Sequence, residues 1–236
     1  AAAAHVDLKD SRLHIADLDI GIADGRLRGD IVIDAREGLP QTTFDLSAAR
    51  LDLKSFFRGT RFIEQMGGRF SGRAKLAGTG KTLADVMATS NGAAELGITE
   101  GSLSGLLIEG AGLDVVEALS LYLGDDARVP IRCGRITLGV EDGLAHAKRV
   151  VVDTTDSTLV AQGRLNLATE ELYLQIEARE KDFSLIDLAA PVVIKGAMTD
   201  PGFAIGGIDP LPFFEMGDQK DVDCKVLMDG IDVTGR

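Results

Sequence analysis

The fold is decided by the stretch Leu159–Ala178, which reads LVAQGRLNLATEELYLQIEA. Apolar side chains alternate with polar ones in both halves, and the polar segment Ala168–Glu171 separates the halves. Because successive side chains of a β-strand point to opposite faces, each half places its apolar residues on one face. The stretch therefore predicts an antiparallel hairpin with one apolar and one polar face. The candidate residues of the apolar face in this hairpin are Leu165, Leu167, Leu172, Leu174 and Ile176.

The same alternation occurs upstream in Arg135–Val140, where the apolar residues are Ile136, Leu138 and Val140. The segment Glu141-Asp142-Gly143 follows, and Asp-Gly is a strong turn signal because glycine adopts positive φ at little cost. Further chain reversals are expected at Asp24-Gly25, Glu100-Gly101, Asp200-Pro201-Gly202 and Asp229-Gly230. Such regular punctuation is typical of an all-β meander.

Helical patterns are fewer than strand patterns. Thr82 is a candidate N-cap with Asp85 at the third helical position, and Asn91-Gly92 ends this pattern. Other short helices are expected within Ser55–Met66, Leu113–Leu123 and Phe183–Ala189. The fold class is therefore mainly β, with a few short helices that pack against or cap a twisted antiparallel sheet.

Composition excludes several classes of function. The chain has 236 residues, with 37 acidic and 25 basic side chains and a net charge of −12. This balance argues against nucleic acid as a partner, because nucleic acid rewards clustered Lys and Arg. With Trp 0 and Tyr 2, the chain also lacks the aromatic platforms that sugars and bases stack on. No apolar run approaches the ~20 residues that span a bilayer.

Motifs suggestive of catalysis fail on inspection. Gly78-Thr79-Gly80-Lys81-Thr82 resembles the end of a phosphate-binding loop, but Lys75 stands where that loop requires glycine. Leu103 is the central residue of Gly101–Gly105, so no serine occupies the position of a nucleophile. The histidines His5, His14 and His146 have no metal-ligand spacing. We expect no enzyme activity, no cofactor and no metal; a hydrolase with an unrecognised acidic site is kept as a remote alternative.

Cys133 and Cys224 are the chain's two cysteines, and they form no CxxC motif. Two interpretations stay open: a pair of buried thiols, or a single disulfide. The disulfide would require an oxidising compartment.

Several segments together resemble the C-terminal domain of the AsmA family of bacterial envelope proteins, which includes TamB-related members. Each segment alone is a weak motif, a glycine turn between amphipathic strands, but the order and spacing of the segments together are more specific for the family. The segments that carry the resemblance are Gly72–Gly80, Ser90–Gly92, Ile98–Gly101, Val151–Thr154, Ala161–Leu167, Ala190–Gly196 and Asp200-Pro201, with the ending near Asp223-Cys224. Residues 12–53 fit the preceding β segment of the family.

The resemblance implies a curled antiparallel sheet that forms an open, apolar-lined groove. It implies a non-enzymatic module on the periplasmic side of the bacterial inner membrane, anchored through an N-terminal helix that this sequence lacks. Phospholipid transport and outer-membrane assembly are the implied roles, with phospholipid or another acyl-chain lipid as the expected ligand. A periplasmic location would also permit a Cys133–Cys224 disulfide.

The alternative is an interaction scaffold, in which the groove is filled by the chain's own helices and envelope proteins are the partners. The division expected from the resemblance is a β-rich segment with a short helix in residues 1–70 and an AsmA-like C-terminal domain in residues 71–236. The first segment is expected to continue into the sheet of the second.

Overall fold

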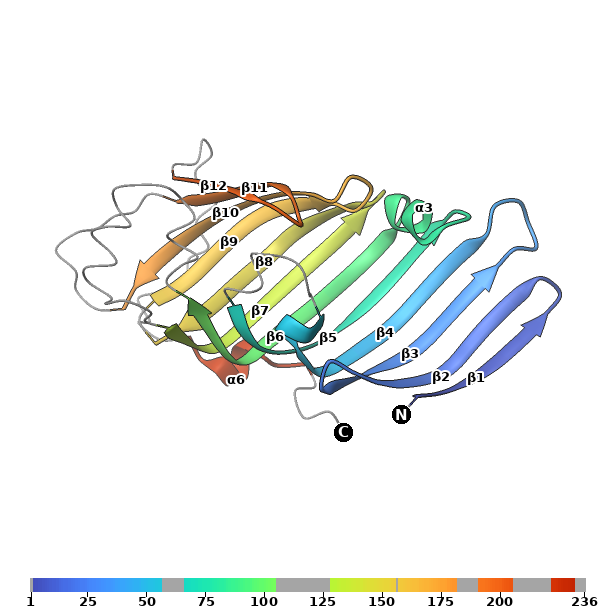
Figure 1. Ribbon diagram of the computed structural model, residues 1–236, viewed down its shortest axis with the longest axis horizontal. Coiled ribbons are helices and arrows are strands. Elements are labelled where there is room, and N and C mark those ends of the chain that lie inside the picture. Colours follow the sequence, from blue (N-terminus) through green and yellow to red (C-terminus); the bar gives the residue numbers. More distant parts are fainter. Residues whose placement is uncertain are drawn as a thin grey trace.

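The computed structural model describes residues 2–56, 66–104, 128–155, 157–181, 191–205 and 222–231. Its dominant feature is one sheet of 12 strands, in which each strand pairs with its neighbours in chain order from β1 to β12. All of these pairings are antiparallel. Figure 1 shows an elongated, twisted sheet with β1 at one edge and β12 at the other. This open antiparallel meander with few helices confirms the predicted fold class.

The strands are longer in the first two thirds of the chain than near its end. Their bounds are β1 Ala2–Lys9, β2 Arg12–Ile22, β3 Gly25–Asp34, β4 Gln41–Asp52, β5 Met66–Thr79, β6 Asn91–Ser104, β7 Arg128–Glu141, β8 Leu144–Thr154, β9 Ser157–Asn166, β10 Glu171–Glu180, β11 Val192–Ala197 and β12 Gly202–Ile205. The described helices are α1 Leu53–Phe56, α3 Leu83–Ala88 and α6 Cys224–Leu227.

The predicted hairpin of Leu159–Ala178 is confirmed as β9 and β10. Leu165 pairs with Leu172 across the two strands, and Ala161 pairs with Ile176, so the apolar residues of both strands share a face. The turn between β7 and β8 is also confirmed: Asp142 and Gly143 both have positive φ, at 47° and 74°. Two consecutive residues of positive φ match the right-handed twist of a hairpin.

The predicted reversal at Glu100-Gly101 is wrong. Strand β6 continues through these residues, and Glu100 adopts a φ of 53° inside the strand. The pairing of β5 with β6 shifts register at this point, which identifies a β-bulge. A residue of positive φ permits either a turn or a bulge, and here the chain continues in the same direction.

The helix predicted from Thr82 is confirmed as α3. The Thr82 hydroxyl accepts a hydrogen bond from the Asp85 backbone N–H at 3.1 Å, and the Asp85 carboxylate accepts one from the Thr82 N–H at 3.0 Å. This reciprocal pair is a capping box, which satisfies N–H groups that have no partner within the helix. Helix α1 covers the start of the expected segment Ser55–Met66, whereas Leu113–Leu123 and Phe183–Ala189 lie outside the described residues.

The buried core of the described residues contains two hydrophobic clusters. One cluster joins Leu53 of α1 with Leu51 and Phe70, and a second contains Ile98, Ile131 and Val152. Strand β5 runs through the predicted division at residues 70 and 71, so the sheet passes from one segment to the next without a break. The division into two domains stays a prediction.

Candidate functional site

One face of the sheet carries three apolar rows that cross ten strands each. Antiparallel partners lie directly opposite one another on the same face, so the register defines which side chains form a row. The first row is Val6, Ile15, Ile31, Phe44, Leu76, Gly92, Val140, Ala145, Leu165 and Leu172. The second is Leu18, Gly29, Leu46, Ala74, Ala94, Leu138, Ala147, Gly163, Leu174 and Ile194. The third is Ile20, Leu27, Ala48, Gly72, Leu96, Ile136, Val150, Ala161, Ile176 and Val192.

We call these three rows the apolar face. They contain no charged and no polar side chain, and each row extends about 43 Å across the sheet at the usual strand spacing. The register assigns to this face every candidate of the sequence analysis except Leu167, which lies just beyond the end of β9. The sequence therefore identified members of a surface that continues through the whole sheet.

Much of the apolar face is half-buried instead of fully enclosed. Ile31, Phe44 and Leu76 have intermediate exposure, and so do Leu138 and Leu174 toward the other edge. At the β1 edge the side chain of Val6 is 61% exposed. A large, partly exposed apolar surface of this kind is uncommon on a monomeric soluble protein.

Two short helices border the apolar face at opposite ends of the central strands. Leu53 of α1 packs on Leu51 and Phe70, where β4 ends and β5 begins. Helix α3 lies beyond the other ends of β5 and β6 (Figure 1), and its Val86 is buried. The half-buried residues Phe44, Leu76 and Leu138 of the face lie between these borders.

The opposite face is polar in its first half. Lys75 and Asp45 form an ion pair at 2.9 Å across β4 and β5, and Arg73 and Glu95 form one at 2.9 Å across β5 and β6. Such exposed pairs contribute little to stability, but they show that water contacts this side of the sheet.

In its second half, part of the opposite face is buried, which differs from the one apolar and one polar face that the alternation predicts. The alternation places Gln175 of β10 on the polar face, but Gln175 is 1% exposed. Val151, Val160 and Val193 lie on the same side and are also buried. A signal for this was present: Val150-Val151-Val152 and Val192-Val193-Ile194 are consecutive apolar residues, and continuous apolar runs are typical of strands buried on both faces.

A disulfide holds α6 against the buried part of this opposite face. Cys133 of β7 and Cys224 of α6 are joined with a Cα–Cα distance of 5.8 Å. Arg135 reinforces the attachment, because its Nη1 donates to the carbonyl oxygens of Leu227 at 3.0 Å and Asp229 at 2.8 Å. Of the two interpretations of the cysteines, the structure contains the disulfide.

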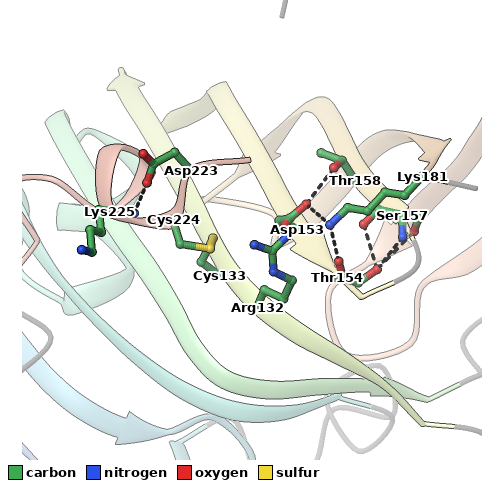
Figure 2. A network of polar contacts seen from close by, with 10 residues as sticks. All are labelled: Arg132, Cys133, Asp153, Thr154, Ser157, Thr158, Lys181, Asp223, Cys224 and Lys225. Atoms are coloured by element: carbon green, nitrogen blue, oxygen red, sulfur yellow. Dashed lines mark hydrogen bonds and ion pairs between the residues drawn. A yellow bond between two sulfur atoms is a disulfide. The ribbon is translucent and has the colours of Figure 1, made fainter. Parts of the chain in front are cut away.

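Beside the disulfide lies a buried carboxylate with cationic partners (Figure 2). Asp153 is 0% exposed; its Oδ1 is 2.8 Å from Lys181 Nζ, and its Oδ2 is 2.8 Å from Arg132 Nη1. Thr158 Oγ1 donates a further hydrogen bond to Oδ1 at 2.8 Å. Lys181 also donates to the Thr154 carbonyl oxygen at 2.6 Å. These contacts compensate the desolvation of the carboxylate. They also hold β7, β8 and β9 and the side chain of Lys181 in fixed positions relative to one another.

This cluster does not provide a metal site or a catalytic group. Ligand atoms of Cys133, Cys224 and Asp153 lie within 4.8 Å of one another, but both sulfurs are bonded to each other and so are not thiolates. The carboxylate is neutralised by two cations inside the protein and has no exposed surface.

The histidines do not form a site either. His14 lies 3.6 Å from Asp30 on the polar face, and His5 and His146 are exposed on β1 and β8. Within the described residues, no histidine belongs to a group of three or more potential metal ligands.

The carboxyl group of Asp34, which has a strongly lowered pKa, belongs to an exposed ion pair. Hydrogen bonds from Arg36 lower the pKa of Asp34 to about 2 from 3.8. Hydrogen bonding from Arg26 likewise lowers the pKa of Asp19. In both cases the arginine stabilises the charged carboxylate and so lowers its pKa. Neither shift therefore indicates a general acid or base.

Fold and site together define an open antiparallel sheet with one extended apolar face, and the described residues form no catalytic cluster. The chain belongs to the AsmA family, whose model matches residues 2–150. It is 27% identical over 197 residues to the AsmA family protein YhjG of Escherichia coli (strain K12). That similarity covers 84% of this chain and 29% of YhjG, so the chain spans under a third of this relative. The search of solved structures found no significant match.

Family membership suggests a role at the bacterial cell envelope, in lipid transport or in assembly. AsmA family proteins are not known as enzymes, in agreement with the expectation from the sequence. Among the helices that the structure describes, none has the length and apolar character needed to cross a membrane.

Proposed function

We propose that this chain is a non-enzymatic module of an inner-membrane-anchored AsmA-type protein, exposed to the periplasm, whose apolar face holds acyl chains. The observation that carries the proposal is the continuity of the three apolar rows across the sheet without an interrupting charge. In this role the module contributes to phospholipid transport and outer-membrane assembly.

The energetics of acyl-chain binding support this role without any reactive group. Each buried CH₂ contributes roughly 0.8 kcal/mol, and the contribution is nearly independent of direction. A chain held by such contacts can slide along a row, because each step exchanges one apolar neighbour for another of the same kind. In the central strands β6 and β8 the rows contain the small residues Gly92, Ala94 and Ala145, whose short side chains leave room above the middle of this surface.

The disulfide supports the periplasmic location. Disulfides persist in oxidising compartments such as the periplasm and are rare in the bacterial cytosol. Thiol alkylation of the native protein in cells tests this point: we expect Cys133 and Cys224 to resist a maleimide reagent until a reductant is added. Immediate labelling of both cysteines in unreduced cells would contradict the periplasmic assignment.

Native mass spectrometry after detergent-free purification tests the lipid proposal. We expect adducts with the masses of phospholipids on the wild-type chain. A protein that is free of lipid, and that takes up none from phospholipid vesicles, would contradict the proposal and favour the alternative of an interaction scaffold.

Two substitutions on the apolar face make this test residue-specific. Leu174→Gln and Ile31→Gln place an uncharged polar group in different halves of the face, and we expect each to reduce the lipid-bound fraction. Arg164→Gln on the opposite face is the control; the Arg164 guanidinium lies 5.5 Å from the Tyr173 ring centre, so its loss costs little stability. Circular dichroism identifies variants that fail to fold, and equal lipid capture by all folded variants would refute the assignment of the face.

A further inference from the structure

A cavity on the polar side of the sheet is lined by arginines and by no carboxylate. Its volume is about 150 Å³, and its lining includes Arg26, Arg28 and Arg73 together with Ser47 and the turn at Gly230-Ile231. Since one water takes up roughly 30 Å³ in the liquid, this space accommodates a group of several heavy atoms. Its arginines project from the side of the strands that lies opposite the apolar face, although Ala48 and Gly72 of the third apolar row also line the cavity.

The sheet register brings the arginines together. Arg28 of β3 lies opposite Ser47 of β4, and Ser47 lies opposite Arg73 of β5, so the three side chains follow one another on the same face. Arg26 precedes Arg28 by two residues on β3 and therefore points in the same direction.

The remaining wall is fixed by the attachment of α6. The Cys133–Cys224 disulfide and the two hydrogen bonds from Arg135 hold the chain that leads to Gly230. Ile231 is buried over β6, where its side chain approaches Gly97. The wall is thus held in place by covalent and polar contacts.

The arginines around the cavity have more N–H donors than the neighbouring acidic side chains accept. Arg26 and Arg28 both contact Asp19 through Nε, at 2.8 Å and 3.4 Å. Among the described residues, their Nη groups have no further hydrogen bond or ion pair. Arg73 contacts Glu95 through a single Nη2, at 2.9 Å. Three guanidiniums therefore retain free N–H donors at one place in a chain of net charge −12.

We propose that this cavity binds a phosphate group. Guanidinium presents N–H donors in a planar fork that matches phosphate oxygens, and several forks around one space suit a tetrahedral anion with several acceptor oxygens. The phosphate belongs either to a lipid headgroup or to a soluble phosphate compound. The inference does not depend on the proposed function, because it concerns the opposite face of the sheet.

Titration with inorganic phosphate tests the site directly. The ¹H–¹⁵N signals of the arginine Nε groups are followed while sodium phosphate is added, with sodium chloride at equal ionic strength as the reference. We expect saturable shifts for Arg26, Arg28 and Arg73 with phosphate and none with chloride. Shifts that do not saturate, or that are equal for both salts, would overturn the proposal.

Variants test the assignment to these residues. Arg28→Gln should weaken phosphate binding about tenfold, the effect typical of losing a charged hydrogen bond. Asp19→Asn should strengthen binding, because it removes the acid that competes for Arg26 and Arg28; a gain of this kind cannot result from misfolding. Arg36→Gln, which also removes an arginine from an exposed ion pair, is the matched control and should bind as the wild type does. Equal affinity in Arg28→Gln and Arg36→Gln would refute the site.

A second arm distinguishes the two sources of phosphate. Flotation with phosphatidylglycerol vesicles is measured with and without inorganic phosphate, using wild type and Arg28→Gln. Vesicle binding that phosphate and Arg28→Gln both reduce assigns the site to a lipid headgroup. Saturable phosphate binding without any vesicle binding assigns it to a soluble compound. Absence of binding to both probes overturns the proposal.

Discussion

Replacing Cys133 and Cys224 together with serine should cost much of the protein's stability. The disulfide closes a loop with a sequence separation of 91, for which the chain-entropy relation gives about 4.6 kcal/mol at 25 °C. Disulfides commonly contribute somewhat less than this limit, so we expect a loss of about 4 kcal/mol. For a chain of this length, such a loss lowers the melting temperature by roughly 10 °C.

Urea and thermal unfolding, followed by circular dichroism, measure this loss. The matched control is the reductant itself: it should destabilise the wild type to the level of the double-serine variant and leave that variant unchanged. A variant within 1 kcal/mol of the wild type, with the disulfide verified in the wild type by peptide mapping, would refute the reasoning. In that case Arg135 and the packing of Ile231 would suffice to hold α6.

Three further predictions concern single side chains. Asp153→Asn should destabilise the protein by about 3–5 kcal/mol in urea unfolding, because Lys181, with a side chain only 9% exposed, loses a charged partner; Asp153→Asn with Lys181→Met should recover part of the loss. Thr82→Ala removes the cap of α3 and should cost about 1 kcal/mol in the same assay, whereas Thr82→Ser should cost far less. The lowered pKa of Asp34, about 2 against 3.8, contributes stability that is present above pH 3.8 and is lost as the pH falls toward 2; carboxyl NMR should show this pKa rising toward 3.8 in Arg36→Gln.

Alternation predicted the apolar face well because the β-strand period is two and does not depend on distant residues. Once Leu165, Leu174 and Ile136 are assigned to one face of their strands, antiparallel pairing places them on one face of the sheet. The number of rows and their continuity depend on the register between strands. Register is set by turns and bulges, so the number of rows could not be derived from any single stretch of sequence.

The arginine cavity and the Asp153 cluster could not be predicted in the same way. Arg28 and Arg73 are far apart in sequence and become neighbours only through the intervening strand β4. Asp153 and Lys181 come together because β9 and β10 return the chain to the end of β8. Side-chain clusters that depend on such non-local pairing produce no pattern in the local sequence. From the sequence, a single polar residue within a strand is therefore predicted to face the solvent.

The bulges explain both the wrong turn at Glu100 and the continuity of the apolar face. Asp17, Arg50 and Glu100 are residues of positive φ within β2, β4 and β6, each at a register shift. Each adds one residue to its strand, and the apolar alternation changes phase at the same position: Leu13 and Ile15 are followed by Leu18 and Ile20.

Because a one-residue slip would turn every later side chain to the opposite face, the change of phase in the sequence cancels the added residue in the backbone. Arg50 and Glu100 also form an ion pair at 3.2 Å, which links the bulges of β4 and β6 across β5. A turn separates two runs of alternation that reverse direction, whereas a bulge shifts the phase within one run. A change of phase in the apolar alternation is therefore the sequence signal that distinguishes the two. After Glu100 the alternation resumes with Gly101 and Leu103, which favours the bulge.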